Sequence, residues 1–135
     1  MMDGVAEKEE FVEFDYFSLW IEKGIICFDY KHDVNFTLDI VKHMVAERIK
    51  LSNGVTRPML LNVKNRLSIE DEARKLLSSK EFSYFLSAGA ILVATPTIRW
   101  AVNILVHIDA PVTPTKLFID KKEALEWLEL FKYMN

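Results

Sequence analysis

The sequence has few of the residues that mark specialised protein classes. A single cysteine, Cys27, excludes an intramolecular disulfide and favours a reducing compartment. Four glycines and four prolines in 135 residues exclude collagen-like and low-complexity chains. Apolar runs reach only about seven residues, whereas a membrane-spanning helix needs about 20. The first ten residues are acidic and polar, unlike a signal peptide. These absences predict a cytoplasmic protein without an integral membrane segment.

The residues that are present predict one globular domain. Half of them are hydrophobic and 27% are charged, which is typical of a folded chain of ordinary domain size. We expect a flexible acidic segment at 1–10 and a single domain at 11–135. The net charge of −3 argues against a nucleic-acid partner, for which a basic domain is expected.

Charge is distributed unevenly along the chain. The net charges of residues 1–40, 41–80 and 81–135 are −7, +5 and −1. The basic middle third could form a local basic surface, or its charges could be solvated and paired with the acidic first third. The residues concerned are Arg48, Lys50, Arg57, Lys64, Arg66, Arg74 and Lys75.

The first half of the chain predicts an antiparallel hairpin followed by a helix and a strand. Residues 11–21 alternate like a half-exposed, aromatic-rich strand, and residues 25–30 form a more buried one. Lys23-Gly24 supplies the turn between them. Thr37 caps a helix over about 38–51, which Asn53-Gly54 ends. The apolar run 59–63 is typical of a strand covered on both faces.

The second half predicts helices and strands in alternation. Ser68 begins a helix that extends to about Leu77, and a second helical piece over about 80–87 is ended by Gly89. The remaining expected elements are a strand at 90–94, a helix at about 96–108 after Thr95-Pro96, a strand at 116–119, and a last helix capped by Asp120. The last helix should turn Ala124, Leu125, Leu128 and Phe131 inward.

This order of elements predicts an α/β fold with the sequence β-β-α-β-α-β-α-β-α. A five-stranded mixed sheet with an N-terminal antiparallel hairpin and helices packed on it is expected. Because the elements account for almost all residues, little material is left for an active-site lid.

The templates of catalytic and metal sites are missing. The three histidines form no zinc-binding spacing, and the glycines form no phosphate-binding loop. No Gly-x-Ser-x-Gly elbow is present, and Cys27 lies within an apolar strand where a buried, inert thiol is expected. We therefore expect a protein that is not an enzyme, with no cofactor and no metal.

One candidate site is the turn after the third predicted strand. Helix N-termini favour anions, and Ser68 stands at such a position with cationic residues beside it. The candidate switch or anion-binding loop comprises Lys64, Asn65, Arg66 and Ser68. The alternative is ordinary helix capping by Ser68, because the acidic residues at 70–72 already complement the helix dipole and would repel a phosphate.

The second candidate is the helix over about 97–108, which is apolar around most of its circumference. Its polar residues Arg99, Asn103 and His107 occupy one narrow stripe. A neighbouring element could cover the extra apolar face of this helix. Otherwise this face lines a pocket, or it meets a partner, a second subunit or a lipid. The candidate interface residues are Trp100, Ile104, Ile108, Trp127 and Leu130.

The element order and several segments resemble STAS-type domains, the fold of bacterial anti-sigma-factor antagonists, which is also related to SEC14-like lipid-binding domains. The chain is most similar to small uncharacterised bacterial proteins of this type. The resembling segments are Glu22-Lys23-Gly24-Ile25-Ile26, Arg57-Pro58-Met59-Leu60-Leu61-Asn62-Val63, Glu72-Ala73-Arg74, Pro114-Thr115-Lys116-Leu117-Phe118 and Ala124-Leu125-Glu126-Trp127-Leu128.

The resemblance implies a cytoplasmic, non-enzymatic regulatory module. In the anti-sigma-factor antagonists a serine at the start of the helix after the third strand is phosphorylated, and Ser68 occupies about that place. Leu67 and Ile69 depart from the family's flanking pattern, so only the location is carried over. The expected function is protein–protein interaction, with self-association as a homodimer. The alternative is a SEC14-like binder of a small apolar ligand or lipid.

Overall fold

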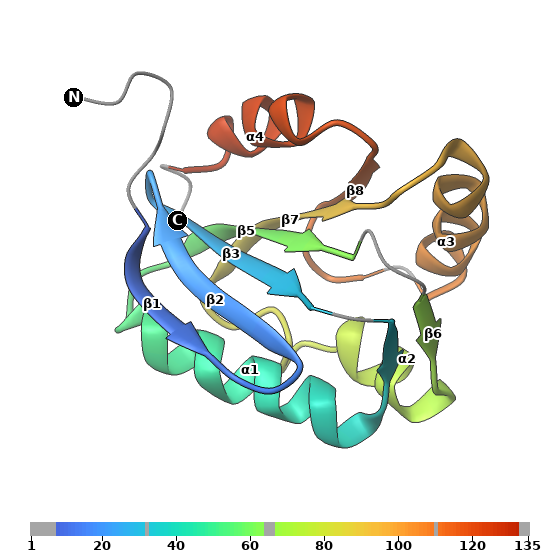
Figure 1. Cartoon of the computed structure of the whole chain (residues 1–135), viewed down its shortest axis with the longest axis horizontal. Helices are drawn as coiled ribbons and strands as arrows, with labels where there is room; N and C mark the ends of the chain where they lie inside the picture. Colours follow the sequence, from blue (N-terminus) through green and yellow to red (C-terminus); the bar gives the residue numbers. More distant parts are fainter. Residues whose placement is uncertain (1–7, 32, 64–66, 110, 133–135) are drawn as a thin grey trace.

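The computed structural model describes residues 8–31, 33–63, 67–109 and 111–132. Its centre is a six-stranded mixed sheet in the order β1-β2-β3-β5-β7-β8 (Figure 1). The first three strands are antiparallel, and β3, β5, β7 and β8 are parallel to one another. The strands are β1 (Glu9–Glu13), β2 (Phe17–Glu22), β3 (Ile25–Tyr30), β5 (Arg57–Asn62), β7 (Leu86–Leu92) and β8 (Thr115–Phe118).

Helices cover both faces of this sheet. The helices α1 (Leu38–Ser52), α2 (Asp71–Leu77) and α3 (Pro96–Asp109) contribute side chains to one buried cluster. The helix α4 (Lys121–Glu129) packs on the opposite face against a second cluster that includes Trp20, Cys27 and Leu60 (Figure 1). The predicted mixed α/β sheet with its N-terminal antiparallel hairpin is therefore confirmed. No described helix is long and apolar enough to cross a membrane.

Three predicted helix starts are confirmed by their capping bonds. A side-chain oxygen before each helix accepts a backbone N–H of the first turn, which satisfies a donor that the helix itself cannot. All three bonds are 3.2 Å long, and they join Thr37 to Ile40, Thr95 to Ile98 and Asp120 to Lys122. At the other end of α1, Asn53 adopts the left-handed conformation expected of a helix stop.

The predicted strand at 11–21 is in fact two strands. β1 and β2 form an antiparallel pair, and the chain reverses between them, where Phe14 N–H donates to the Phe17 carbonyl at 2.8 Å. The sheet consequently has six strands instead of five, and β1 begins at Glu9. The turn contains no glycine or proline, so the aromatic alternation runs through it without a visible break.

Ser68 does not begin a helix. It lies in the short strand β6 (Leu67–Ile69), which pairs in parallel with β4 (Val34–Phe36) in a separate two-stranded sheet. The extended backbone continues to Glu70, whose N–H donates to the Phe36 carbonyl at 3.0 Å. Glu70 is therefore the N-cap of α2, without a side-chain capping bond, and the helix begins at Asp71.

The predicted helical piece at 80–87 is wrong as well. Turns follow α2, and β7 already begins at Leu86. Ser79 Oγ donates to the Leu76 carbonyl at 2.6 Å and accepts from Phe82 N–H at 3.3 Å. Backbone bonds in this segment span three residues, as from Ser83 N–H to the Lys80 carbonyl at 3.0 Å, so it forms turns instead of an α-helix. Gly89 is not a helix stop, because it lies inside β7 and pairs with Met59 and Thr115 of the neighbouring strands.

Candidate functional site: an apolar cavity

An apolar cavity of about 130 Å³ lies between the sheet and two of its helices. Its walls come from β5, β7, β8, α2, α3, the turns between α2 and β7, and the segment before β8. The side chains that define it include Met59 and Leu61 of β5, Ile91 of β7, and Val102 and Val106 of α3. Phe36 and Ile69, from the small β4–β6 sheet, also line it.

Three of the hydroxyl groups that line the cavity donate their hydrogen bonds to the backbone. Ser78 Oγ donates to the Arg74 carbonyl at 3.2 Å, and Ser83 Oγ donates to the Ser79 carbonyl at 3.3 Å. Thr115 Oγ1 donates to the Thr113 carbonyl at 2.9 Å. Because these three hydroxyl protons are already engaged, the cavity offers a mostly apolar surface to a ligand.

Arg74 is the one charged residue among the described lining residues. It is half-buried, and its Nη1 lies 3.5 Å from an Asp71 carboxylate oxygen on the same helix. The described lining contains no histidine, cysteine or carboxylate residue. Among all described residues, no group of three His, Cys, Asp or Glu side chains could hold a metal ion.

Gly89 forms part of the cavity boundary because it has no side chain. A Cβ built there would lie 3.9 Å from Met59 Cε and 4.0 Å from Thr115 Oγ1, and both of these residues also line the cavity. Its neighbours Ala88 and Ala90 face the other side of the sheet, as the alternation along a strand requires. The sequence alone does not indicate this role, because a lone glycine before an apolar run also fits a helix stop.

The turns that close the cavity are held by a buried cation on α1. Arg48 is only 1% exposed, and its guanidinium donates to the carbonyls of Phe82 and Tyr84, the latter at 2.7 Å. Its Cζ also lies 5.3 Å from the centre of the Phe82 ring. Burial lowers the pKa of Arg48 to about 10, so the side chain stays charged at neutral pH. Arg48 therefore takes no part in a basic surface of the middle third.

Of the predicted switch loop, the structure describes only Ser68, which lies in β6, two residues before Glu70, the N-cap of α2. Lys64, Asn65 and Arg66 lie outside the described residues. Ser68 is exposed, and its Oγ donates to Asn35 Oδ1 of β4 at 2.9 Å. Phosphorylation of Ser68 stays a prediction, and the residue lies in a strand of the small sheet.

The predicted interface residues do not form one surface. Trp100 and Ile104 of α3 are 70% and 43% exposed, and Leu130, just after α4, is 71% exposed. Because α3 and α4 cover opposite faces of the sheet, these residues belong to two separate regions (Figure 1). Trp127 is half-buried against Phe118 and Phe131, with ring centres 5.8 and 4.8 Å away. The side chain of Ile108 lies outside the described part of the chain.

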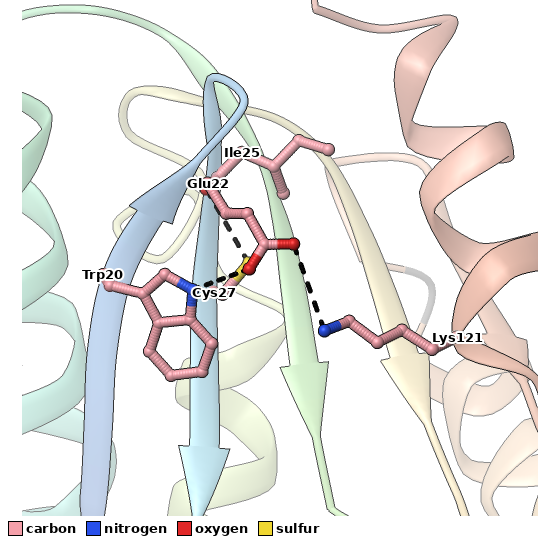
Figure 2. A network of polar contacts seen from close by, with 5 residues as sticks. All are labelled: Trp20, Glu22, Ile25, Cys27 and Lys121. Atoms are coloured by element: carbon pink, nitrogen blue, oxygen red, sulfur yellow. Dashed lines mark hydrogen bonds and ion pairs between the residues drawn. The ribbon is translucent and has the colours of Figure 1, made fainter. Parts of the chain in front are cut away.

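A polar network on the α4 face surrounds the single cysteine (Figure 2). The buried carboxylate of Glu22 accepts from Trp20 Nε1 at 3.1 Å and lies 4.0 Å from Lys121 Nζ. Cys27 Sγ contacts the Ile25 carbonyl at 3.8 Å. Burial, assisted by the charge of Glu22, raises the pKa of the Cys27 thiol to about 12. The expectation of a buried cysteine is confirmed, and the thiol is protonated at neutral pH.

Comparisons with known proteins agree with this architecture. No curated protein matches the chain. Among solved structures, the chain is similar to an uncharacterized protein of the DUF3478 family with a SpoIIAA-like fold from Shewanella loihica PV-4. The TM-score is 0.55 at 16% sequence identity, and the match covers 95% of this chain and 98% of the other. At that identity the likeness shows the fold alone, and it confirms the predicted STAS-like fold.

The family itself is shown by the sequence. Residues 19–132 match the profile of DUF7793, a domain of unknown function. The matched region extends from β2 to just beyond α4, so it includes every element that lines the cavity. The chain therefore belongs to the DUF7793 family, and its structure has a SpoIIAA-like fold.

Proposed function

We propose that the protein is a non-enzymatic binding module that takes a small apolar molecule, or the apolar end of a larger one, into the cavity beside α3. The observation that carries this proposal is the chemistry of the lining: apolar side chains, with the hydroxyl donors of Ser78, Ser83 and Thr115 engaged by the backbone. Apolar contacts and displaced water would supply the affinity.

The size of the cavity limits the ligand. An apolar cavity of roughly 150 Å³ is large enough to hold benzene in another protein. The cavity of about 130 Å³ therefore suits a single ring or a short aliphatic chain. Because typical ligand pockets measure about 300–1,000 Å³, a larger ligand would leave its remaining atoms outside. The absence of histidine, cysteine and carboxylate from the described lining supports binding without catalysis.

Titration with toluene, followed by NMR, tests this proposal. Saturable shifts are expected for the backbone amides of Leu61, Gly89 and Ile91. The variant Val102→Phe should abolish these shifts, because its larger ring fills the cavity from α3. Ile104→Phe is the matched control, since it adds a ring on the exposed side of the same helix. Unsaturable shifts spread over the surface, identical in both variants, would contradict the proposal.

Self-association through α3 is a second candidate function, as expected of a protein-interaction module. Trp100 and Ile104 support it, because they lie one turn apart and form an exposed apolar pair. Large exposed aromatic residues are frequent anchors of protein interfaces. The proposed partner is a second copy of this chain, and the apolar cavity on the inner side of α3 stays available for a ligand.

Analytical ultracentrifugation tests whether the chain associates with itself through α3. The wild-type chain should sediment as a dimer at high micromolar concentration, and Trp100→Glu should be a monomer because a charge cannot be buried there without a partner. Leu130→Glu provides the control, since Leu130 is as exposed as Trp100 but lies on the α4 side. A monomeric wild-type chain throughout the concentration range would rule out the dimer.

A further inference from the structure

We infer that Gly89 sets the depth of the cavity, and that the buried part of the ligand is an aliphatic chain whose length this residue limits. The inference rests on the proposed binding function and deepens it. Its basis is the position of a residue without a side chain in an inner strand of the sheet, between Met59 and Thr115.

Glycine is an unexpected residue at this position. Inside a strand it contributes no side-chain packing, and it often marks a place where another group approaches closely. The backbone of Gly89 does not require glycine, because its φ lies outside the left-handed region. Space does not require glycine either, since a Cβ would meet its nearest neighbours at ordinary contact distances of 3.9 and 4.0 Å.

The space that a Cβ would occupy belongs to the cavity. Met59 and Thr115, the two residues nearest to that position, both line it, as does Ile91 on the same face of β7. A methyl group at residue 89 would therefore take volume from a cavity of only about 130 Å³. Each methylene of a bound chain that is buried in an apolar site strengthens binding by roughly fourfold.

The groups around Gly89 favour a ligand whose buried end carries no polar atoms. Thr115 Oγ1, which lies beside Gly89, donates to the Thr113 carbonyl, so its proton is not directed to a ligand. The neighbouring Met59 and Ile91 side chains are apolar. A hydroxyl or carboxylate buried at this depth would lose its hydration without a compensating donor, whereas a methyl end would not.

A series of straight-chain alcohols from butanol to octanol tests the inference. For the wild-type chain, the affinity measured by NMR should rise about fourfold with each methylene until the cavity is full, and then level off. For Gly89→Ala, butanol should bind as before, but the affinity should level off at a shorter chain. The longest alcohol that gains affinity in the wild type should bind at least threefold more weakly to this variant.

Ala90→Gly is the control, because it changes one methyl group on the same strand but on the α4 face. Its chain-length profile should match that of the wild type. If the alcohols bind and Gly89→Ala levels off at the same length as the wild type, or weakens every alcohol equally, the inference about Gly89 is overturned while the binding function stands. If no alcohol binds the wild-type chain but toluene does, the inference is overturned and the binding function stands; if neither binds, both are overturned.

Discussion

Replacing Arg48 with methionine is expected to lower the free energy of unfolding by about 3 kcal/mol. The substitution leaves the carbonyls of Phe82 and Tyr84 without their donors, and each unsatisfied buried group costs roughly 1–3 kcal/mol. The relief of a buried charge offsets part of this loss, because Nε of Arg48 makes no hydrogen bond among the described residues. Urea denaturation followed by circular dichroism measures the difference.

Two further variants define the origin of this effect. Arg48→Lys keeps the charge, but a single ammonium group cannot reproduce the fork of two bonds, so an intermediate loss is expected. Lys50→Met removes a charge from the exposed side of the same helix and should change the stability by less than about 0.5 kcal/mol. A loss below 1 kcal/mol in Arg48→Met would show that the turns hold their position without this cation.

The Cys27 thiol should make the protein less stable in alkaline solution. Its pKa is raised to about 12 in the folded chain, compared with 9.0 for an unperturbed thiol. Between these values the unfolded chain releases a proton that the folded chain retains. The stabilisation linked to the thiol is therefore complete below pH 9 and is lost as the pH rises toward 12. The loss amounts to about 1.4 kcal/mol for each pH unit in this range.

Comparison with Cys27→Ala isolates this contribution from the other groups that titrate at high pH. The stability difference between the wild-type chain and the variant should be constant from pH 7 to 8. At pH 10 it should have moved by about 1.4 kcal/mol in favour of the variant. Urea denaturation in the presence of a reducing agent provides both values. An unchanged difference between pH 7 and pH 10 would mean that the thiol is accessible to water in the folded chain.

Sequence patterns predicted the elements whose boundaries are set locally. The helix α1 begins after Thr37 and α4 begins after Asp120, because each start depends on a side chain within a few residues of the backbone that it caps. The buried strands β5 and β7 were recognisable from their apolar runs, since a strand covered on both faces has little polar alternation. The predicted order of helices and main strands followed from these signals.

The errors arose where distant residues determine the local structure. The turns at 80–85 have helix-compatible side chains, but two of their carbonyls are bound by Arg48, which precedes them by more than 30 positions. The sequence predicts a helix start at Ser68, but the extended conformation of this residue depends on pairing with Asn35 and its neighbours in β4. Neither contact leaves a periodic signal in the sequence.

The apolar surplus of the α3 helix was visible in the sequence, but its use was not. The structure divides this surplus: Ile98, Val102 and Val106 pack inward, and Val102 and Val106 line the cavity. Trp100 and Ile104 point outward on the same helix. A helical pattern shows how many faces of a helix are apolar. Whether the inner face is fully packed or borders a cavity depends on residues that are distant in the sequence, such as Gly89.

The arrangement of α4 also has a consequence during protein synthesis. Its buried residues Ala124 and Leu128 belong to the same cluster as Trp20 and Cys27, which the ribosome makes much earlier. Until α4 has been made, this face of the sheet lacks its helical cover, even when the other helices are in place. Exposed apolar surface of this kind promotes aggregation. Nascent chains that stall before α4 should therefore depend more on chaperones than completed ones.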